Sequence, residues 1–196
     1  MFYQIEPLFP GLTRIWDVAR TAMYLVEGAD RAVLIDTGVG VGDLKSVVAG
    51  LTDKPVTVLL THGHVDHALG AVGFDDVRMN PLDKGVYAEH CDFGGRKGYV
   101  MGSAMQGGDP ALVASITDAD YLEPRAAEDF APLAAGDTFD LGGVTVQLTL
   151  RPVDLQTELL ELHITVGGVV GEKGLFFHSL SPAFAKQRLP LFMRIF

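Results

Sequence analysis

The stretch that decides the fold is Val56–Gly70, which reads VTVLLTHGHVDHALG. Its first five residues form a nearly continuous apolar run, and such a run is typical of a strand that is buried on both faces. Histidines and an aspartate then gather within six positions, at His62, His64, Asp66 and His67. Loops at strand ends often carry the chemistry of sheet proteins, so we expect a functional site on this loop.

The residue types on this loop point to metal binding. Imidazole and carboxylate groups are ligands that suit zinc, and iron and manganese bind them too. His62 and His64 are two positions apart, so an extended segment directs both side chains the same way. Asp66 and His67 follow after a turn and can face a second ion. Two metal ions about 3.5–4 Å apart can activate a hydroxide and polarise a carbonyl or phosphoryl oxygen.

The rest of the chain predicts strands and helices in alternation. We expect strands at residues 12–18, 22–26, 32–35, 56–60, 76–79, 137–141 and 144–148, and helices at 43–51, 81–90 and 110–116. The first two strands are expected to form a hairpin. Residues Gly94–Gly108 are rich in glycine, which predicts a loop. No linker is long enough to divide domains, so residues 1–196 are expected to form a single domain.

Composition narrows the function classes. The 196 residues include 15 basic and 25 acidic side chains, for a net charge of -10. A phosphate backbone needs a cationic face, so nucleic acid is not the expected partner. Cys91 is the only cysteine, which excludes an internal disulfide and fits a cytoplasmic location. No apolar run of about 18 residues occurs and the first residues do not resemble a signal peptide, so no membrane partner is expected.

Val56–Gly70 resembles the signature of the metallo-β-lactamase fold superfamily, whose core motif is HxHxDH. The resemblance continues upstream in Thr21–Val26 and Val33–Gly38, and downstream in Gly136–Val146, so that it covers about residues 10–150. It implies an α+β fold of the αββα sandwich type. This fold would be incomplete in its C-terminal half if residues 151–196 are altered.

The resemblance also implies a ligand set. His62 and His64 would bind a first metal ion, and Asp66 and His67 a second, with zinc as the expected metal in one or two copies and iron or manganese as alternatives. A metal-bound hydroxide is the nucleophile in this family, and Asp66 would be the catalytic residue that orients it. Asp36 would steady the metal-binding loop from behind the ligands; a plain turn cap is the alternative for Asp36.

The sequence departs from the family after Leu150. A third histidine normally follows the strand that Val144–Leu150 resembles, but the chain continues RPVDLQT. Later, His178 and Ser179 stand where a Gly-Asp pair is expected. The candidates for substitute ligands are Asp154, His163 and His178, none of them in a matching context. For His163 and His178, and equally for His90, the plainer interpretation is an ordinary side chain of a strand or helix.

The tail itself has two explanations. Residues Lys173–Phe196 contain no acidic residue and end in the apolar stretch LPLFMRIF. A reading-frame change near codon 151 would explain both the lost likeness and the changed composition of residues 151–196. A divergent tail in the original frame is the alternative, and the family-like strand Leu175–Phe177 favours it. An altered half would expose apolar surface, and a homo-oligomer is one way to cover it.

Three functions remain open. The first is a metal-dependent hydrolase of a small ester, thioester, lactone or lactam, with a small-molecule substrate. The second is a metal-binding domain that is catalytically impaired, because two ligands hold each ion weakly. The third is an iron-dependent redox or sulfur-transferring member of the same fold.

Overall fold

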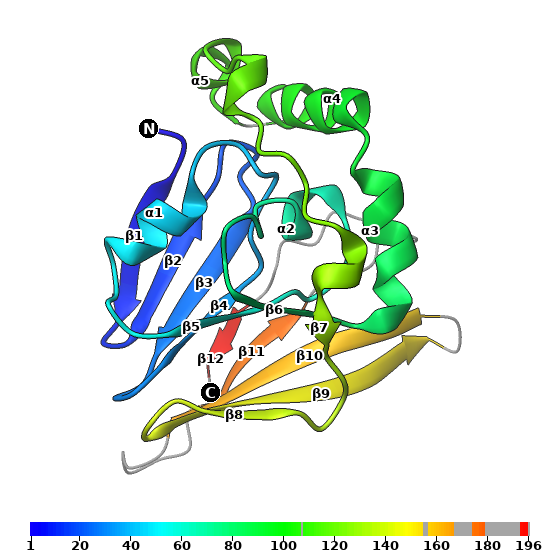
Figure 1. Ribbon diagram of the computed structural model, residues 1–196. Coiled ribbons are helices and arrows are strands. Elements are labelled where there is room, and N and C mark those ends of the chain that lie inside the picture. Colours follow the sequence, from blue (N-terminus) through cyan, green and yellow to red (C-terminus); the bar gives the residue numbers. More distant parts are fainter. Residues whose placement is uncertain (107, 155–156, 167–173, 179–192, 196) are drawn as a thin grey trace. The chain divides into compact units, whose positions relative to one another are not determined.

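The computed structural model describes residues 1–106, 108–154, 157–166, 174–178 and 193–195 (Figure 1). The chain folds into two compact units. The first unit comprises Met1–Val26 and Ala32–Pro132, and the second comprises Glu27–Arg31 and Leu133–Phe196. Among the described residues, no helix combines the length and apolar character needed to cross a bilayer.

The first unit is built on a mixed sheet, seven-stranded over the described residues, in the order β1-β2-β3-β4-β5-β6-β7. Its strands are β1 (Gln4–Phe9), β2 (Leu12–Trp16), β3 (Ala22–Glu27), β4 (Ala32–Ile35), β5 (Val56–Leu59), β6 (Asp76–Met79) and β7 (Ala131–Pro132). The expected hairpin is confirmed, because β2 and β3 pair antiparallel. Strands β4 to β7 run parallel to one another. They therefore end at the same edge of the sheet.

Both edge strands of this sheet contain a proline. Pro7 lies within β1, where the register shifts between Pro7 and Phe9, and Pro132 ends the short β7. Proline has no N–H to donate to a neighbouring strand, so it is tolerated at sheet edges and bulges. The position of both prolines therefore agrees with the strand order.

The helices of the first unit connect its strands. They are α1 (Leu44–Ala49), α2 (Val65–Ala68), α3 (Lys84–His90), α4 (Phe93–Ala104) and α5 (Pro110–Ala114), with 3₁₀ turns at Pro81–Asp83, Asp118–Asp120 and Ala127–Asp129. The expected helix at 43–51 is confirmed as α1, whose N-cap Asp43 accepts a hydrogen bond from the backbone N–H of Ser46. The expected helix at 81–90 divides into a 3₁₀ turn and α3.

The prediction of a loop at Gly94–Gly108 is wrong, because α4 occupies most of that stretch. The side chain of Asp92 caps the helix by accepting from the N–H of Gly95. Arg96 and Val100 lie four residues apart on one face, and both are buried. Tertiary packing of that face therefore outweighs the poor helix propensity of the glycines.

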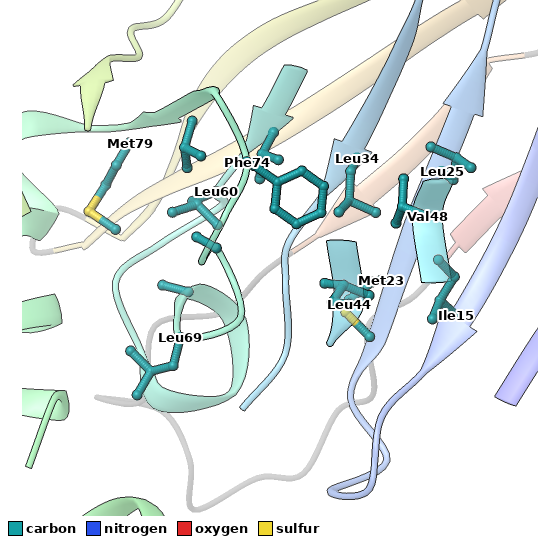
Figure 2. Close-up of a cluster of buried hydrophobic side chains, with 14 of the residues drawn as sticks. Ile15, Met23, Leu25, Leu34, Leu44, Val48, Leu60, Leu69, Phe74 and Met79 are labelled. Atoms are coloured by element: carbon teal, nitrogen blue, oxygen red, sulfur yellow. The ribbon is translucent and has the colours of Figure 1, made fainter. Parts of the chain in front are cut away.

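A hydrophobic core lies between α1 and the sheet of the first unit (Figure 2). Leu44 and Val48 are four residues apart, so they share the face of α1 that meets the sheet. Leu34 of β4 is fully buried in the same cluster. Burying one such side chain contributes about 1.5–3 kcal/mol. This core holds the strands whose ends carry the polar residues considered below.

The second unit is an antiparallel sheet, five-stranded over the described residues, in the order β12-β11-β10-β9-β8. Its strands are β8 (Thr138–Asp140), β9 (Val144–Asp154), β10 (Thr157–Val166), β11 (Gly174–His178) and β12 (Met193–Ile195). The strand expected at 144–148 is present but continues to Asp154 because its backbone pairs with β10 along that length. The backbone N–H groups of Ala29 and Asp30 bind the carbonyls of Gly142 and Leu141.

Candidate metal centre

The metal loop, residues Thr61–His67, changes its backbone conformation half way along. His64 has extended backbone angles and caps the N-terminus of α2, so the chain turns into a helix at Val65. That turn brings Asp66 and His67 back toward His62. One ligand atom from each of His62, Asp66 and His67 lies within 4.8 Å of the others. Three of the four predicted ligands are therefore gathered closely enough to share or bridge metal ions.

His64 stands beside this group. Its ring centroid lies 4.6 Å from that of His62. Its Nδ1 atom is buried and has no hydrogen-bond partner among the described residues. A buried nitrogen without a partner is costly, and a bound cation would satisfy it.

Asp36 organises the loop from the end of the neighbouring strand. Its Oδ1 accepts hydrogen bonds from the N–H (2.8 Å) and the hydroxyl (2.9 Å) of Thr61, and its Oδ2 lies 2.8 Å from Nδ1 of His67. The hydroxyl of Thr61 also lies 3.0 Å from Nδ1 of His62. Asp36 thus fixes the orientation of His67 directly and of His62 through Thr61, as carboxylates behind metal ligands do.

The backbone of Asp36 is unusual, with φ at 60°. Aspartate tolerates the left-handed region better than most residues because its short side chain can bind locally. The next residue, Thr37, donates from both its N–H and its hydroxyl to the carbonyl of His67, at 2.7 and 3.0 Å. The turn after β4 therefore holds both the ring and the backbone of His67.

The charges at the site favour the ligand forms of these groups. Burial and nearby imidazoles lower the pKa of His62 well below its usual value and that of His64 to about 4. Burial alone would raise the pKa of Asp66, but the charge of His67 outweighs it and lowers that pKa. At neutral pH the loop presents two neutral imidazoles and an ionised carboxylate, which are the forms that bind metal.

His67 differs from the other two histidines. Burial opposes its positive charge, but Asp66 and Asp36 outweigh burial and raise its pKa well above the usual value. Its Nε2 lies 3.4 Å from Oδ2 of Asp66. In the metal-free protein, His67 is therefore held as a cation between two carboxylates, where a metal ion would replace its proton.

Tyr99 and Arg96 belong to the surroundings of the site, and neither is predicted from the sequence, because the glycines of this stretch indicate a loop. The hydroxyl of Tyr99 donates to Oδ2 of Asp66 at 2.7 Å. Arg96, one helical turn earlier on α4, is 2% exposed and donates to the carbonyls of Leu122 (2.9 Å) and Gly40 (3.2 Å). Arg96 thus anchors the helix that places Tyr99. The signal that could have found them is the helix cap at Asp92.

His90, for which the sequence favours an ordinary side chain, lies close to the metal loop. It is the last residue of α3, and its ring centroid lies 4.8 Å from that of His64 in an edge-on arrangement. α3 is held close to the metal loop at Gly63, where an added Cβ would lie 2.6 Å from the carbonyl oxygen of Asp83 and 2.8 Å from the nitrogen of Tyr87. Glycine at position 63 therefore permits the approach that brings His90 to His64.

The remaining candidates fall on the second unit. Asp154 ends β9, His163 is the register partner of Gln147 and Phe176, and His178 is the partner of Glu161. Only the backbone is described at these three positions, so their side chains lie outside the described part of the chain.

The donor set of the metal loop fits a divalent cation such as zinc. It offers imidazole nitrogens and a carboxylate, and it includes the buried Nδ1 of His64 that has no described partner. We expect His62 and His64 to hold a first ion, and Asp66 and His67 a second.

Comparison with known proteins identifies the family. Residues 16–155 match the family model of the metallo-beta-lactamase superfamily. An uncharacterized protein of Mycobacterium tuberculosis is 29% identical over 122 residues, which are 62% of this chain and 50% of that protein. One of Mycobacterium leprae is 30% identical over 129 residues, 63% of this chain and 54% of that protein. The chain thus spans about half the length of the curated relatives it matches.

Solved structures share the fold. A beta-lactamase from Chitinophaga pinensis has a TM-score of 0.56 at 20% identity, covering 92% of this chain and 65% of that one. A mutant metallo-beta-lactamase from Cronobacter sakazakii has a TM-score of 0.52 at 20% identity, covering 89% and 63%. These neighbours confirm the expected fold class, of the αββα metallo-β-lactamase type. On the strength of the family match, this chain belongs to the metallo-β-lactamase superfamily.

Proposed function

We propose that this chain is a metal-dependent hydrolase that acts on a small ester, thioester, lactone or lactam. The observation that carries the proposal is the convergence of His62, Asp66 and His67, whose ligand atoms lie within 4.8 Å of one another. The buried carboxylate of Asp36 behind them supports it, because it fixes His67 at 2.8 Å. When bound, zinc supplies Lewis acidity and lowers the pKa of a water molecule.

The residues around the loop have separate tasks. Asp66 accepts the hydroxyl of Tyr99 at 2.7 Å, so one of its oxygens is fixed. In this proposal, that carboxylate accepts a proton from a water molecule and orients it toward a carbonyl carbon. Asp36 keeps Nδ1 of His67 occupied, so that Nε2 is the atom presented to the site.

The charge of the chain and its family both bear on the substrate class. The net charge of -10 disfavours a polyanionic substrate such as a nucleic acid. Several structural neighbours are beta-lactamases by name, which act on an activated carbonyl. A small carbonyl substrate is consistent with both observations. We expect zinc as the metal, in one or two copies.

The test is hydrolysis of chromogenic esters, thioesters, lactones and lactams by the full chain loaded with zinc. We expect turnover of at least one substrate, loss on addition of a chelator and recovery when zinc is restored. His62→Ala should abolish turnover, whereas Asp53→Ala, at a position away from the loop, should not. Turnover that survives both the chelator and His62→Ala would overturn the proposal.

A second candidate is a domain that binds metal but is catalytically impaired. The observation in its favour is that the family match ends at residue 155, where the family's later ligands would follow. This candidate expects zinc to bind and His62→Ala to weaken that binding, with no turnover of any substrate in the panel. Zinc binding and turnover measured on the same preparation separate the two candidates.

A further inference from the structure

Within the metal loop, the first metal position has no third nitrogen ligand. His62 and His64 supply two, whereas a tetrahedral catalytic zinc usually has three protein ligands and a water molecule. The chain reads RPVDLQT where the family's third histidine is expected. Asp66 and His67 are already tied to Asp36 and Tyr99. The missing ligand must come from another element.

His90 is the histidine that the described structure places next to this position. α3 is fixed against the metal loop at Gly63, where the backbone of Asp83 and Tyr87 leaves no room for a Cβ. Tyr87 is itself buried, and its hydroxyl donates to the carbonyl of Arg125 at 2.8 Å. His90 follows Tyr87 by three residues, so it lies on the same face of the helix. A rigid element thus carries His90 to the metal loop.

The spacing of the rings agrees with a shared ion. Two imidazoles on one tetrahedral zinc, with Zn–N distances of about 2.0–2.1 Å, place their ring centroids roughly 5 Å apart. His64 has one neighbouring imidazole at 4.6 Å, that of His62, and another at 4.8 Å, that of His90. The buried Nδ1 of His64 has no partner among the described residues. His64 therefore has two neighbouring imidazoles at a suitable spacing and a nitrogen that needs a ligand.

We propose that His90 is the third nitrogen ligand of the first metal ion, together with His62 and His64. The imidazole of His90 makes a ring contact with His64 and no hydrogen bond to any described residue, so it can rotate toward the ion at little cost. This inference rests on the metal site of the proposed function and not on its hydrolytic activity. It also makes the first metal position independent of the residues after Leu150.

The direct test is a titration of the full chain, labelled with ¹⁵N in its histidines, with Zn²⁺. An imidazole nitrogen shifts strongly when it binds zinc, and single His→Ala variants assign the signals. We expect the ring nitrogens of His62, His64 and His90 to shift together at the first equivalent of zinc. A shift of His163 or His178 in place of His90 would overturn the inference.

The second test is zinc affinity, measured by competition with a chelator. We expect His90→Ala to weaken binding of the first ion by at least about tenfold, the lower end of what a lost supporting partner costs. Glu89→Ala, the exposed neighbour on α3, and His178→Ala should change it less than twofold. Equal affinity of His90→Ala and the unaltered chain, together with an unshifted His90 signal, would overturn the inference.

The outcomes also separate this inference from the proposed function. Zinc bound through His90 without turnover of any substrate supports the inference and overturns the hydrolase. Turnover with zinc, together with unchanged zinc affinity of His90→Ala, supports the hydrolase and overturns the inference about His90. A chain that binds no zinc overturns both.

Discussion

The two sheets differ in which residues meet at the ends of their strands. In the first unit, β4 and β5 run parallel, so Asp36 after β4 and Thr61 after β5 emerge at the same edge. In the second unit, consecutive strands run antiparallel, and a tight turn at Gly142–Gly143 returns the chain from β8 to β9. Asp140 there binds the N–H of Gly142, only two residues on. The parallel strand ends of the first sheet bring distant residues together, whereas the turn between β8 and β9 joins near neighbours.

This difference explains where the polar chemistry of the described residues lies. Asp36 and His67 are 31 positions apart in the sequence and 2.8 Å apart in space. A parallel pair needs a crossover connection, and the crossover brings its own polar residues to the shared edge. The largest expected effects of mutation should therefore fall at that edge.

The comparison predicts that two aspartates at strand ends differ greatly in importance. Asp36→Ala leaves the N–H of Thr61 and Nδ1 of the charged His67 without their partner in a buried place, so we expect a loss of about 3–5 kcal/mol in the free energy of unfolding. Asp140→Ala removes an exposed turn contact, and we expect a change within about 0.5 kcal/mol. Urea unfolding of both variants measures the two free energies of unfolding. Equal losses of stability in the two variants would contradict the predicted difference.

The core beneath the parallel edge gives the next effect. Leu34 of β4 is 0% exposed, so Leu34→Ala should cost about 2–5 kcal/mol through lost burial and a cavity. Leu82 is 76% exposed, and Leu82→Ala should leave stability nearly unchanged. Chemical denaturation measures both. A loss below about 1 kcal/mol for Leu34→Ala would show that this core does not support the edge.

Tyr99→Phe is expected to act on metal binding with little effect on folding. It removes the hydroxyl that holds Oδ2 of Asp66 and keeps the ring. Groups that orient metal ligands typically contribute about 10–100-fold to affinity, so we expect zinc binding to weaken by about tenfold. Tyr121→Phe is the matched control: this tyrosine packs edge-on against Phe93, and the variant should bind as the unaltered chain does. Competition with a chelator measures both, and equal affinities would remove Tyr99 from the site.

The smallest single effect is expected at a glycine. Gly98 in α4 has helical surroundings and open space at its Cβ, so Gly98→Ala should stabilise the chain by about 0.5–1 kcal/mol. Gly136 in the second unit also has open space, but its φ is 89°. Gly136→Ala should therefore destabilise by about 1 kcal/mol or more. Thermal unfolding of both variants is the measurement, and effects of the same sign would be inconsistent with the helix at Gly98.

The elements that have a regular apolar pattern or a capping residue at their start were predictable from the sequence. The apolar run before the metal loop predicted β5, and Asp43 with the following apolar spacing predicted α1. The residue types of the metal loop indicated metal binding, and the gathering of His62, Asp66 and His67 agrees with it. These features depend on local pattern alone.

The features that depend on tertiary contact were missed. The glycines of α4 predicted a loop because the packing of Arg96 against backbone carbonyls is invisible in the sequence. With α4 absent, Tyr99 could not be related to Asp66. The place of His90 beside the metal loop was not predictable either, because only the close approach at Gly63 brings α3 to that loop. Spacing within one element cannot predict a contact between elements.

The prolines at the two borders of the seven-stranded sheet have a consequence for aggregation. An edge strand is a template on which another chain can add a strand, and it is the usual starting point of fibrils. Pro7 removes a donor from β1 where its register shifts, and Pro132 does so in the two-residue β7. Among the described residues, neither border strand has an uninterrupted row of backbone donors. We therefore expect strand addition to the sheet that supports the metal loop to be disfavoured at both of these borders.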